Sequence, residues 1–491
     1  MDSALSSEAA LSSEAALSSE AASSRMTVPD YRNVSFWLDS LAASGVDDLT
    51  PRAALASDVS VDVCIVGGGL TGLWTAYYLK KANPSLDIAV LEKNIAGFGA
   101  SGRNGGWCST LFPLSASALE ARYGFESAVA MRKAMNDTVD EVGRATLAEG
   151  IDCDFVKGGT VTFVRTRAQL AGARSEVAEA LLFDVDRVSL WGADTVGARF
   201  PGAAARAATF TPDCASVQPA KLVRGLARVV ESLGVAISER TAVTGWTAGE
   251  VRVVTAGGPR TVRATTVVNA TEGYGSTLPQ VGRAVIPLYS LMIATEPLPE
   301  ETWQRIGLEH GQTFSDFRHL LVYGQRTADN RIAFGGRGAR YHWGSAIRPS
   351  YDRVARVTHH LHKALLGLFP DVGSARITHE WGGPLGVTRD WHASVGYDKA
   401  SGMAWAGGYV GDGLSTTNLA GRTLADLIMD RETELTRLPW VNHRSPRWEP
   451  EPLRFLGANG GLLGMEFADV EEQVTRRSSL TARLIAPLVG R

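Results

Sequence analysis

Cysteine is scarce in this chain of 491 residues. The four cysteines, Cys64, Cys108, Cys153 and Cys214, lie far apart and include no Cys-x-x-Cys pair. A disulfide framework and a zinc site therefore have no support, and no metal site is predicted. We expect buried thiols in a reducing cytoplasm, because unpaired cysteines behave as small apolar side chains.

An excess of charge and long apolar runs are also missing. The formal net charge is −3 at pH 7, and 21% of the residues are charged. Without a basic excess, nothing indicates nucleic acid as a partner. No run of 18 apolar residues occurs, so no membrane span is predicted. The length suits two or more domains, each with its own core.

The N-terminal segment lacks the basic start and apolar stretch of an export signal. Residues 4–9, 10–15 and 16–21 each read Ala-Leu-Ser-Ser-Glu-Ala instead. A period of six fits neither the helix nor the heptad. We therefore expect residues 1–33 to form a disordered repeat tail.

The first informative pattern is a strand, a glycine turn, a helix and a second strand. Val59–Val66 is β-branched and ends in an apolar run, as a buried parallel strand does. The turn Gly67–Gly72 follows at once, and residues 70–81 favour a helix. A second strand, Asp87–Leu91, leads to Glu92. This is a βαβ unit of the expected length.

Each part of this unit suits an adenine dinucleotide. Gly67 permits the tight turn, Gly69 admits a pyrophosphate to the backbone, and Gly72 lets the helix pack on the strand. The helix N-terminus offers amide groups to the phosphates, and Glu92 can accept hydrogen bonds from a ribose. The unit does not separate NAD from FAD. The candidate contacts are Gly67, Gly69, Leu70, Thr71, Gly72, Glu92 and Lys93.

Two more glycine-rich segments favour FAD. Residues 97–106 contain five glycines in ten positions and suit a loop along a long polar cofactor. Residues 407–415 form another glycine turn before an expected helix, which can place amides near a ring that becomes anionic on reduction. Arg103 is expected to neutralise pyrophosphate charge, with a plain surface arginine as the alternative. The candidate contacts are Ser101, Gly102, Arg103, Asn104, Gly105, Gly106, Gly408, Gly411, Gly413, Leu414 and Ser415.

A family resemblance rests on these segments and on others in order along the chain. The segments are 101–106, 218–222, 267–271, 295–298, 331–338, 380–384 and 407–414. With them the chain resembles the D-amino-acid-oxidase/glycine-oxidase class of FAD-dependent oxidoreductases. Within that class it is most similar to gamma-glutamylputrescine-oxidase-like amine oxidases.

The resemblance implies an α/β fold with a Rossmann-like FAD-binding domain that is interrupted by a mixed-sheet substrate domain. Residues 34–130, 207–280 and 377–435 would form the first domain, and residues 131–206 and 281–376 the second. Residues 436–491 would be a C-terminal extension, irregular at first and ending in a helix near 473–488. The resemblance also implies cofactor contacts at Val243, Ala270 and Thr271.

The implied chemistry is oxidation of a primary or secondary amine, a polyamine or amino-acid derivative, to an imine that hydrolyses to an aldehyde or keto acid. Oxygen would yield hydrogen peroxide. A substrate ammonium has a pKa near ~10 and must lose its proton first, so we expect a desolvating aromatic pocket. The candidate catalytic residues are Tyr323, Trp381, His342 and Arg337. For Tyr323, Trp381 and His342, ordinary core packing is the alternative, and for Arg337 a structural ion pair.

The chain departs from one group of relatives in two ways. Sarcosine-oxidase-like enzymes place a lysine near the flavin, whereas the comparable Ile332 and Ala333 are apolar here. An amine or D-amino-acid dehydrogenase with a non-oxygen acceptor is therefore the alternative. Those enzymes also attach flavin through a late cysteine. No cysteine follows Cys214 here, so we predict non-covalent FAD. A homo-oligomer stays open.

Overall fold

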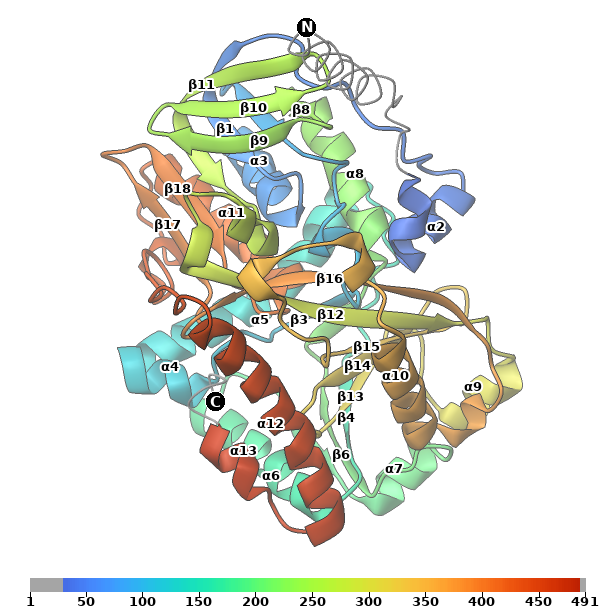
Figure 1. Ribbon diagram of the computed structural model, residues 1–491. Coiled ribbons are helices and arrows are strands. Elements are labelled where there is room, and N and C mark those ends of the chain that lie inside the picture. The colour runs from blue at the N-terminus through green and yellow to red at the C-terminus, as the bar shows by residue number, and fades with distance from the viewer. Residues whose placement is uncertain (1–29, 486–491) are drawn as a thin grey trace, which may run out of the picture.

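The computed structural model describes residues 30–485. Most of the expected N-terminal tail lies outside these residues. Its predicted end at residue 33 is too late, because Tyr31 is already buried and packs edge-on against Phe98 at 6.2 Å between ring centroids. A short helix, α2 (Phe36–Ala43), follows on the flank of the molecule (Figure 1).

The first sheet is built around the strand that precedes the glycine turn. β1 (Val59–Val66) pairs in parallel with β2 (Ile88–Leu91) and with β11 (Gly258–Asn269). Val63 and Ile65 pack toward the helices, whereas Cys64 and Val66 face the β9–β10 hairpin, as the two-residue period of a strand requires. The other strands are β8 (Ala236–Ser238), β9 (Ala242–Thr247), β10 (Glu250–Thr255), β17 (Ser394–Asp398) and β18 (Met403–Gly407).

The second sheet has eight strands in the order β16-β12-β15-β14-β13-β4-β6-β5. It is mixed, because β13 and β4 run parallel while the other neighbours are antiparallel. The long pair of β12 and β16 crosses the middle of the molecule (Figure 1). The strands are β4 (Thr160–Val164), β5 (Ser189–Trp191), β6 (Ala207–Thr211), β12 (Val285–Thr295), β13 (Thr313–Asp316), β14 (Val322–Arg326), β15 (Ile332–Gly336) and β16 (Ile377–Thr388).

Helices cover both sheets, and α11 packs against α3 and α5 beside the first. α10 packs on β12 and β15 of the second sheet, where an apolar core fills the space between them. A two-stranded ribbon of β3 (Trp107–Ser109) and β7 (Cys214–Ser216) completes the described strands. The helices are α3 (Leu70–Ala82), α4 (Ala116–Tyr123), α5 (Phe125–Ala148), α6 (Arg167–Phe183), α7 (Ala193–Arg199), α8 (Pro219–Ser232), α9 (Glu300–Ile306), α10 (Ala355–Leu368) and α11 (Gly413–Ile428).

The predicted α/β fold with a mixed second sheet is confirmed. The domain limits remain a prediction. Two strands belong to a different sheet from the one that these limits imply. β6 (Ala207–Thr211) and β16 (Ile377–Thr388) belong to the second sheet, although both were placed with the cofactor domain. Pairing across the sheet depends on distant strands, which local patterns do not reveal.

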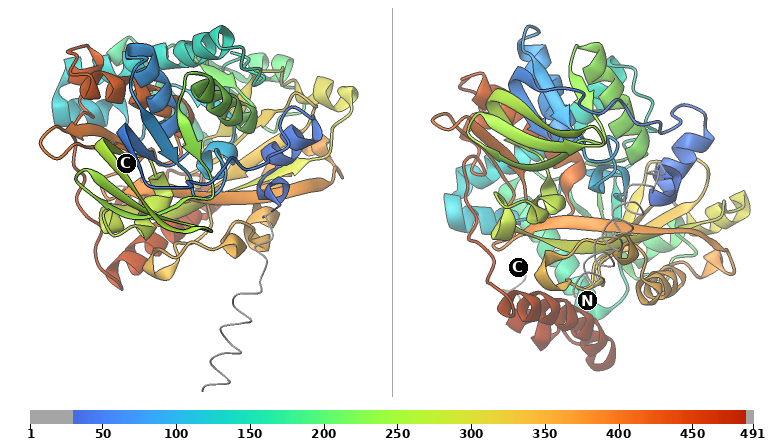
Figure 2. Two further views of the ribbon diagram at one scale, coloured as in Figure 1. Left: turned by 90° about the horizontal axis from the view of Figure 1, so that it is seen from above. Right: turned by 45° about the horizontal axis from the view of Figure 1, so that its top comes forward.

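The C-terminal extension is helical far earlier than expected. α12 (Leu453–Thr475) begins twenty residues before the predicted helix, and α13 (Leu480–Ile485) follows it. The helix was not predicted here because four glycines lie between residues 457 and 464, and glycine lowers helix propensity. Packing overrides that preference, and α12 lies along the outside of the molecule in both Figure 1 and the right-hand view of Figure 2. Between residues 30 and 485, no helix has the length and apolarity needed to cross a membrane.

Candidate active site

A long cavity of about 680 Å³ opens where β1, β2 and β11 end and where α3 and α11 begin. Carboxyl ends of parallel strands and helix N-termini meet at the same edge of such a sheet, which is where nucleotides bind. The cavity therefore joins the glycine turn after β1 to the glycine turn before α11. Of the predicted cofactor contacts, it is lined by Gly67, Gly69, Leu70, Thr71, Glu92, Lys93, Ser101, Asn104, Val243, Ala270, Thr271, Gly411, Gly413 and Leu414.

The turn at Gly67 admits no side chain. Gly67 has a φ of +113°, and a Cβ atom there would lie 2.6 Å from the carbonyl oxygen of Ala270. At Gly72 a Cβ would lie 2.1 Å from the carbonyl oxygen of Gly67, so this glycine allows α3 to pack on the turn. The helix cap, Gly69, brings no side-chain hydrogen bond, and the first amide of α3, that of Leu70, donates to the Ser101 hydroxyl at 2.9 Å. The next amides, those of Thr71 and Gly72, are the ones that a ligand could use. These features fit a pyrophosphate.

Glu92 lies in the cavity at the end of β2. Its carboxylate accepts hydrogen bonds from the backbone amides of Gly68 and Asn94, each at 2.8 Å. Burial raises the pKa of Glu92, and the two amides partly oppose that shift. A fixed carboxylate at this place is the group that the two hydroxyls of a ribose require. The residues present therefore fit FAD.

Seven predicted cofactor contacts do not line this cavity. Ser415, for example, donates from its hydroxyl to the carbonyl oxygen of Ser109, and a Cβ on Gly102 would meet the carbonyl oxygen of Gly97 at 2.3 Å. These residues shape the surrounding backbone. The seven are Gly72, Gly102, Arg103, Gly105, Gly106, Gly408 and Ser415.

Arg103 occupies a different position from the one expected. It is buried, and its guanidinium forms an ion pair with Asp352 at 2.6 Å and donates to the carbonyl oxygens of Gly382 and Phe98 at 2.9 and 2.7 Å. The guanidinium also lies over the Phe98 ring, 4.5 Å from its centroid. Arg103 thus ties the cofactor loop to the second sheet and lies at the wall of a second cavity.

This second cavity, of about 460 Å³, lies between the cofactor cavity and the second sheet. The two cavities share Ala100, Asn104, Leu385, Gly411 and Leu414, so a molecule in one is a neighbour of a molecule in the other. Tyr323 and Arg337, two of the candidate catalytic residues, line the second cavity. The Tyr323 hydroxyl is 2.9 Å from the hydroxyl of Ser290.

Trp381 and His342 line neither cavity. Trp381 is fully buried and donates from its indole to the carbonyl oxygen of Arg103 at 2.8 Å. His342 stacks on Tyr351 with 3.4 Å between ring centroids, and burial lowers its pKa. In these positions, Trp381 and His342 contribute to packing, which is the structural role given as the alternative.

Two acidic residues were missed by the sequence analysis. Glu272 lies in the cofactor cavity and accepts from the backbone amides of Tyr409 at 3.0 Å and Gly386 at 2.5 Å, while burial raises its pKa to about 7. Asp412 lies in the second cavity, and burial raises its pKa to about 6 against the opposing charges of Arg337 and Arg132. One feature of the sequence could have indicated them. Glu272 directly follows the segment 267–271, and Asp412 lies within the glycine-rich segment 407–415.

Asp412 is notable for its lack of an ion-pair partner. The other aspartates of the second cavity are paired, Asp213 with Arg187 and Asp316 with Arg318. Among the described residues, no lysine or arginine lies within ion-pair distance of Asp412. A carboxylate with a raised pKa in an enclosed cavity is typical of a functional group.

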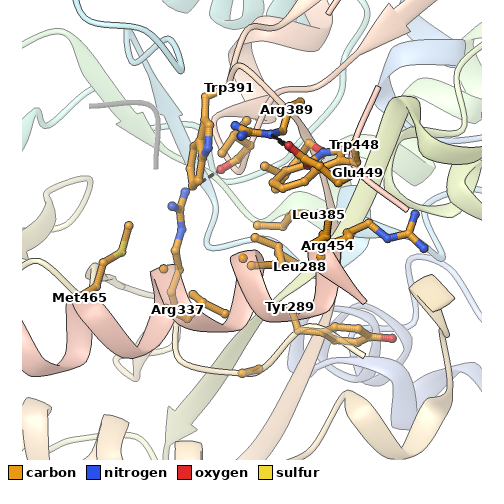
Figure 3. Close-up of a pocket in the computed structure, with 18 residues that line it drawn as sticks. Leu288, Tyr289, Arg337, Leu385, Arg389, Trp391, Trp448, Glu449, Arg454 and Met465 are labelled. Carbon is orange, nitrogen blue, oxygen red and sulfur yellow. Dashed lines mark hydrogen bonds and ion pairs between the residues drawn. The ribbon is translucent and has the colours of Figure 1, made fainter. Parts of the chain in front are cut away.

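A third cavity of about 310 Å³ lies under α12. Figure 3 shows Arg337 reaching toward Trp391, with the guanidinium 5.3 Å from the ring centroid, and Arg389 paired with Glu449 at 3.0 Å. Arg337 borders both this cavity and the second one. Leu385 borders all three.

The fold and the paired cavities define a flavin-dependent oxidoreductase. The model of the DAO family, FAD dependent oxidoreductase, matches residues 62–427, and the chain belongs to this family. It is an enzyme of that class and depends on FAD. None of its four cysteines lines the cofactor cavity, Cys214 lines the second cavity, and non-covalent attachment of FAD stays a prediction.

Particular relatives agree with the sequence resemblance. Gamma-glutamylputrescine oxidoreductase of Escherichia coli strain K12 is 28% identical over 428 residues, which cover 85% of this chain and 96% of that protein. The probable oxidoreductase OrdL of Haemophilus influenzae is 28% identical over 382 residues, 76% of this chain and 84% of that protein. Glycine oxidase from Geobacillus kaustophilus has the same fold, with a TM-score of 0.62 at 22% identity, covering 78% of this chain and 99% of that chain.

Proposed function

We propose that the enzyme oxidises a primary or secondary amine, a polyamine or amino-acid derivative, to an imine that water converts to an aldehyde or keto acid. The observation that carries this proposal is Asp412. Asp412 forms no direct ion pair among residues 30–485, although the charges of Arg337 and Arg132 act on it from a greater distance. Its carboxylate, beside the cofactor cavity, would attract the ammonium group of a cationic substrate.

Asp412 would also take a proton from that substrate. An alkylammonium has a pKa near ~10 in water and must be neutral before a hydride equivalent leaves its carbon. Enclosure in the cavity lowers that pKa, and a carboxylate with a pKa of about 6 is a suitable acceptor near neutral pH. Bound FAD supplies the two-electron oxidation, after which oxygen is reduced to hydrogen peroxide.

Tyr323 and Arg337 would position the substrate. The hydroxyl pair of Tyr323 and Ser290 offers a donor and an acceptor in the cavity that Asp412 also lines. Arg337 donates to the carbonyl oxygen of Val410 at 2.8 Å, which orients its guanidinium at the cavity wall. From there it would bind a carboxylate if the substrate is an amino-acid derivative.

An anaerobic screen tests the proposal. Purified holoenzyme is mixed with diamines, N-methyl amino acids and D-amino acids, and bleaching of the flavin absorbance near 450 nm is followed. We expect at least one of these amines to bleach the flavin. Flavin that stays oxidised with every amine would contradict the proposal.

The second candidate is a dehydrogenase with the same half-reaction and a different electron acceptor. Ile332 and Ala333, where some relatives carry a lysine, are buried and apolar on β15. Reoxidation of the reduced enzyme distinguishes the two. Rapid reoxidation in air with stoichiometric peroxide supports the oxidase, whereas slow reoxidation in air with fast turnover on a dye supports the dehydrogenase. Cytoplasmic action is part of the proposal, since all four cysteines are free and buried.

A further inference from the structure

The outer face of α12 carries an apolar stripe. On a helix with 100° per residue, its six members fall within an arc of about 100°, opposite the face buried against the body. Their exposed fractions run from 46% at Leu463 to 77% at Val474. We call them the outer stripe: Leu453, Leu456, Leu463, Phe467, Val470 and Val474.

The spacing within the outer stripe is that of a helix-pairing seam. With Gly460 included, successive members from Leu456 to Val474 are separated by four, three, four, three and four residues. This alternation is the a/d pattern by which one helix packs on another. Gly457 and Gly460 lie at or beside the stripe with open space in front of them, where small residues let a second backbone approach.

The inner face of α12 is fixed, so the helix cannot turn to bury the stripe. The Asp469 carboxylate accepts from the backbone amides of His319 and Leu320 at 2.7 and 2.9 Å. The Asn459 amide both accepts from the backbone amide of Tyr341 and donates to its carbonyl oxygen, each at 3.1 Å. Within residues 30–485, the outer stripe therefore remains exposed.

The exposed apolar area is that of a standard protein interface. The outer stripe, together with Leu480 and Leu484 on α13 beside it, presents on the order of 800 Å² of side chain, the share of one partner in an interface of standard size. Monomers rarely expose a contiguous apolar patch above a few hundred Å².

We propose that the outer stripe binds the same stripe of a second copy of this chain, with the two α12 helices antiparallel about a two-fold axis near Leu463. The two carboxylates that flank the outer stripe, Glu466 and Glu471, both lie in the second half of α12, whereas the first half carries only Arg454, which pairs with Glu451. A parallel pair would align the carboxylates, and an antiparallel pair sets them beside the uncharged half. A two-fold contact of this kind also closes on itself.

A membrane surface fits the stripe less well. Helices that lie on anionic lipid carry lysine and arginine along the edges of the apolar face. The flanks of α12 itself carry Glu466 and Glu471, and the arginines of this region, Arg476, Arg477 and Arg483, lie at its end and on α13. The acidic flanks thus favour a protein partner.

The dimer would brace the substrate cavity from outside. Asp469 holds the backbone of His319, which lines the second cavity, and the inner face of α12 lines the third. The proposed contact does not depend on which reaction the enzyme catalyses.

Cysteine cross-linking tests the contact and its direction. If the axis passes near Leu463, Leu463→Cys forms a disulfide with itself across the dimer. Leu456→Cys alone does not, but a mixture of Leu456→Cys and Val470→Cys does. The four native cysteines are buried and give little background. A cross-link of Leu456→Cys with itself, or none with any variant, would overturn the proposal.

Light scattering on a sizing column gives the oligomeric state. We expect holoenzyme at micromolar concentration to have twice the mass of one chain. The double variant Leu463→Glu/Phe467→Glu should raise the dimer dissociation constant at least a hundredfold. The matched control is Leu147→Glu, because Leu147 on α5 is 85% exposed and outside the stripe. Thermal unfolding and FAD absorbance verify that each variant is folded.

Three outcomes would refute the contact. They are a monomeric holoenzyme at tens of micromolar, a dimer that persists in the double variant, and co-sedimentation with vesicles of phosphatidylcholine and phosphatidylglycerol that the double variant abolishes. The last result would assign the stripe to a lipid surface.

Discussion

Replacing Asp412 with asparagine should stabilise the enzyme and slow its reaction at the same time. Burial raises the pKa of Asp412 from 3.8 to about 6 in the folded protein. The folded state therefore holds this proton more tightly than the unfolded chain does, and stability is lost as pH rises from 4 through 6. A rise of roughly two pKa units corresponds to about 3 kcal/mol, present as a penalty in the wild type at pH 8.

Asp412→Asn removes the penalty because the amide stays neutral. We expect the free energy of unfolding of the variant to exceed that of the wild type by about 2–3 kcal/mol at pH 8, and the two to converge near pH 4. Denaturant unfolding followed by circular dichroism measures both values. Asp194→Asn is the control, because Asp194 is exposed in the first turn of α7.

The kinetic effect has the opposite sign. With a pKa of about 6, the ionised fraction of Asp412 falls about tenfold between pH 7 and pH 5, and the wild-type rate of flavin reduction by amine should fall with it. Asp412→Asn should lower the rate at pH 7 by roughly a hundredfold or more and flatten that limb of the pH profile. Stopped-flow absorbance under anaerobic conditions measures it. A variant with an unchanged pH profile, or without added stability at pH 8, would refute the reasoning.

Three further variants test the cofactor site and the connection between the sheets. Gly67→Ala should cost on the order of 2 kcal/mol and yield colourless protein, because its Cβ would lie 2.6 Å from the carbonyl oxygen of Ala270; a normal flavin spectrum would contradict this. Glu92→Gln should weaken FAD binding ten- to a hundredfold in a flavin-fluorescence titration, since a charged acceptor for ribose is lost, and unchanged affinity would count against that role. Arg103→Met should lower the free energy of unfolding by about 3–5 kcal/mol, because it leaves Asp352 unpaired; a loss below about 1 kcal/mol in guanidinium unfolding would show that the ion pair is dispensable.

Local sequence patterns were sufficient to predict the part of the site that would bind the adenine end of the cofactor. The run from Val59 to Gly72 and the carboxylate of Glu92 belong to one βαβ unit, in which the spacing along the chain fixes the spacing in the fold. In the structure, Gly67 and Gly69 of the turn line the same cavity as Glu92. The apolar runs likewise sufficed for the fold class.

Residues whose environment is made by distant segments could not be predicted in this way. Burial raises the pKa of Glu272, and the opposing amides of Gly386 and Tyr409 that donate to it lie more than a hundred residues away along the chain. Arg103 has the residue type of a phosphate ligand, yet Asp352 lies within reach only in the folded chain. The glycines of α12 made a helix there unpredictable from local propensity. Its position depends on contacts with distant residues, such as that of Asp469 with Leu320.

The Leu385 side chain lies where the three cavities meet and separates them from one another. Because this one side chain on β16 borders all three cavities, its size sets how far the space beside the cofactor extends toward α12. A shorter residue would connect the chambers and admit bulkier or branched amines, and a larger one would confine the site to small molecules. Evolution or laboratory selection could therefore change the range of accepted substrates by altering a single codon, while the residues that hold FAD stay untouched.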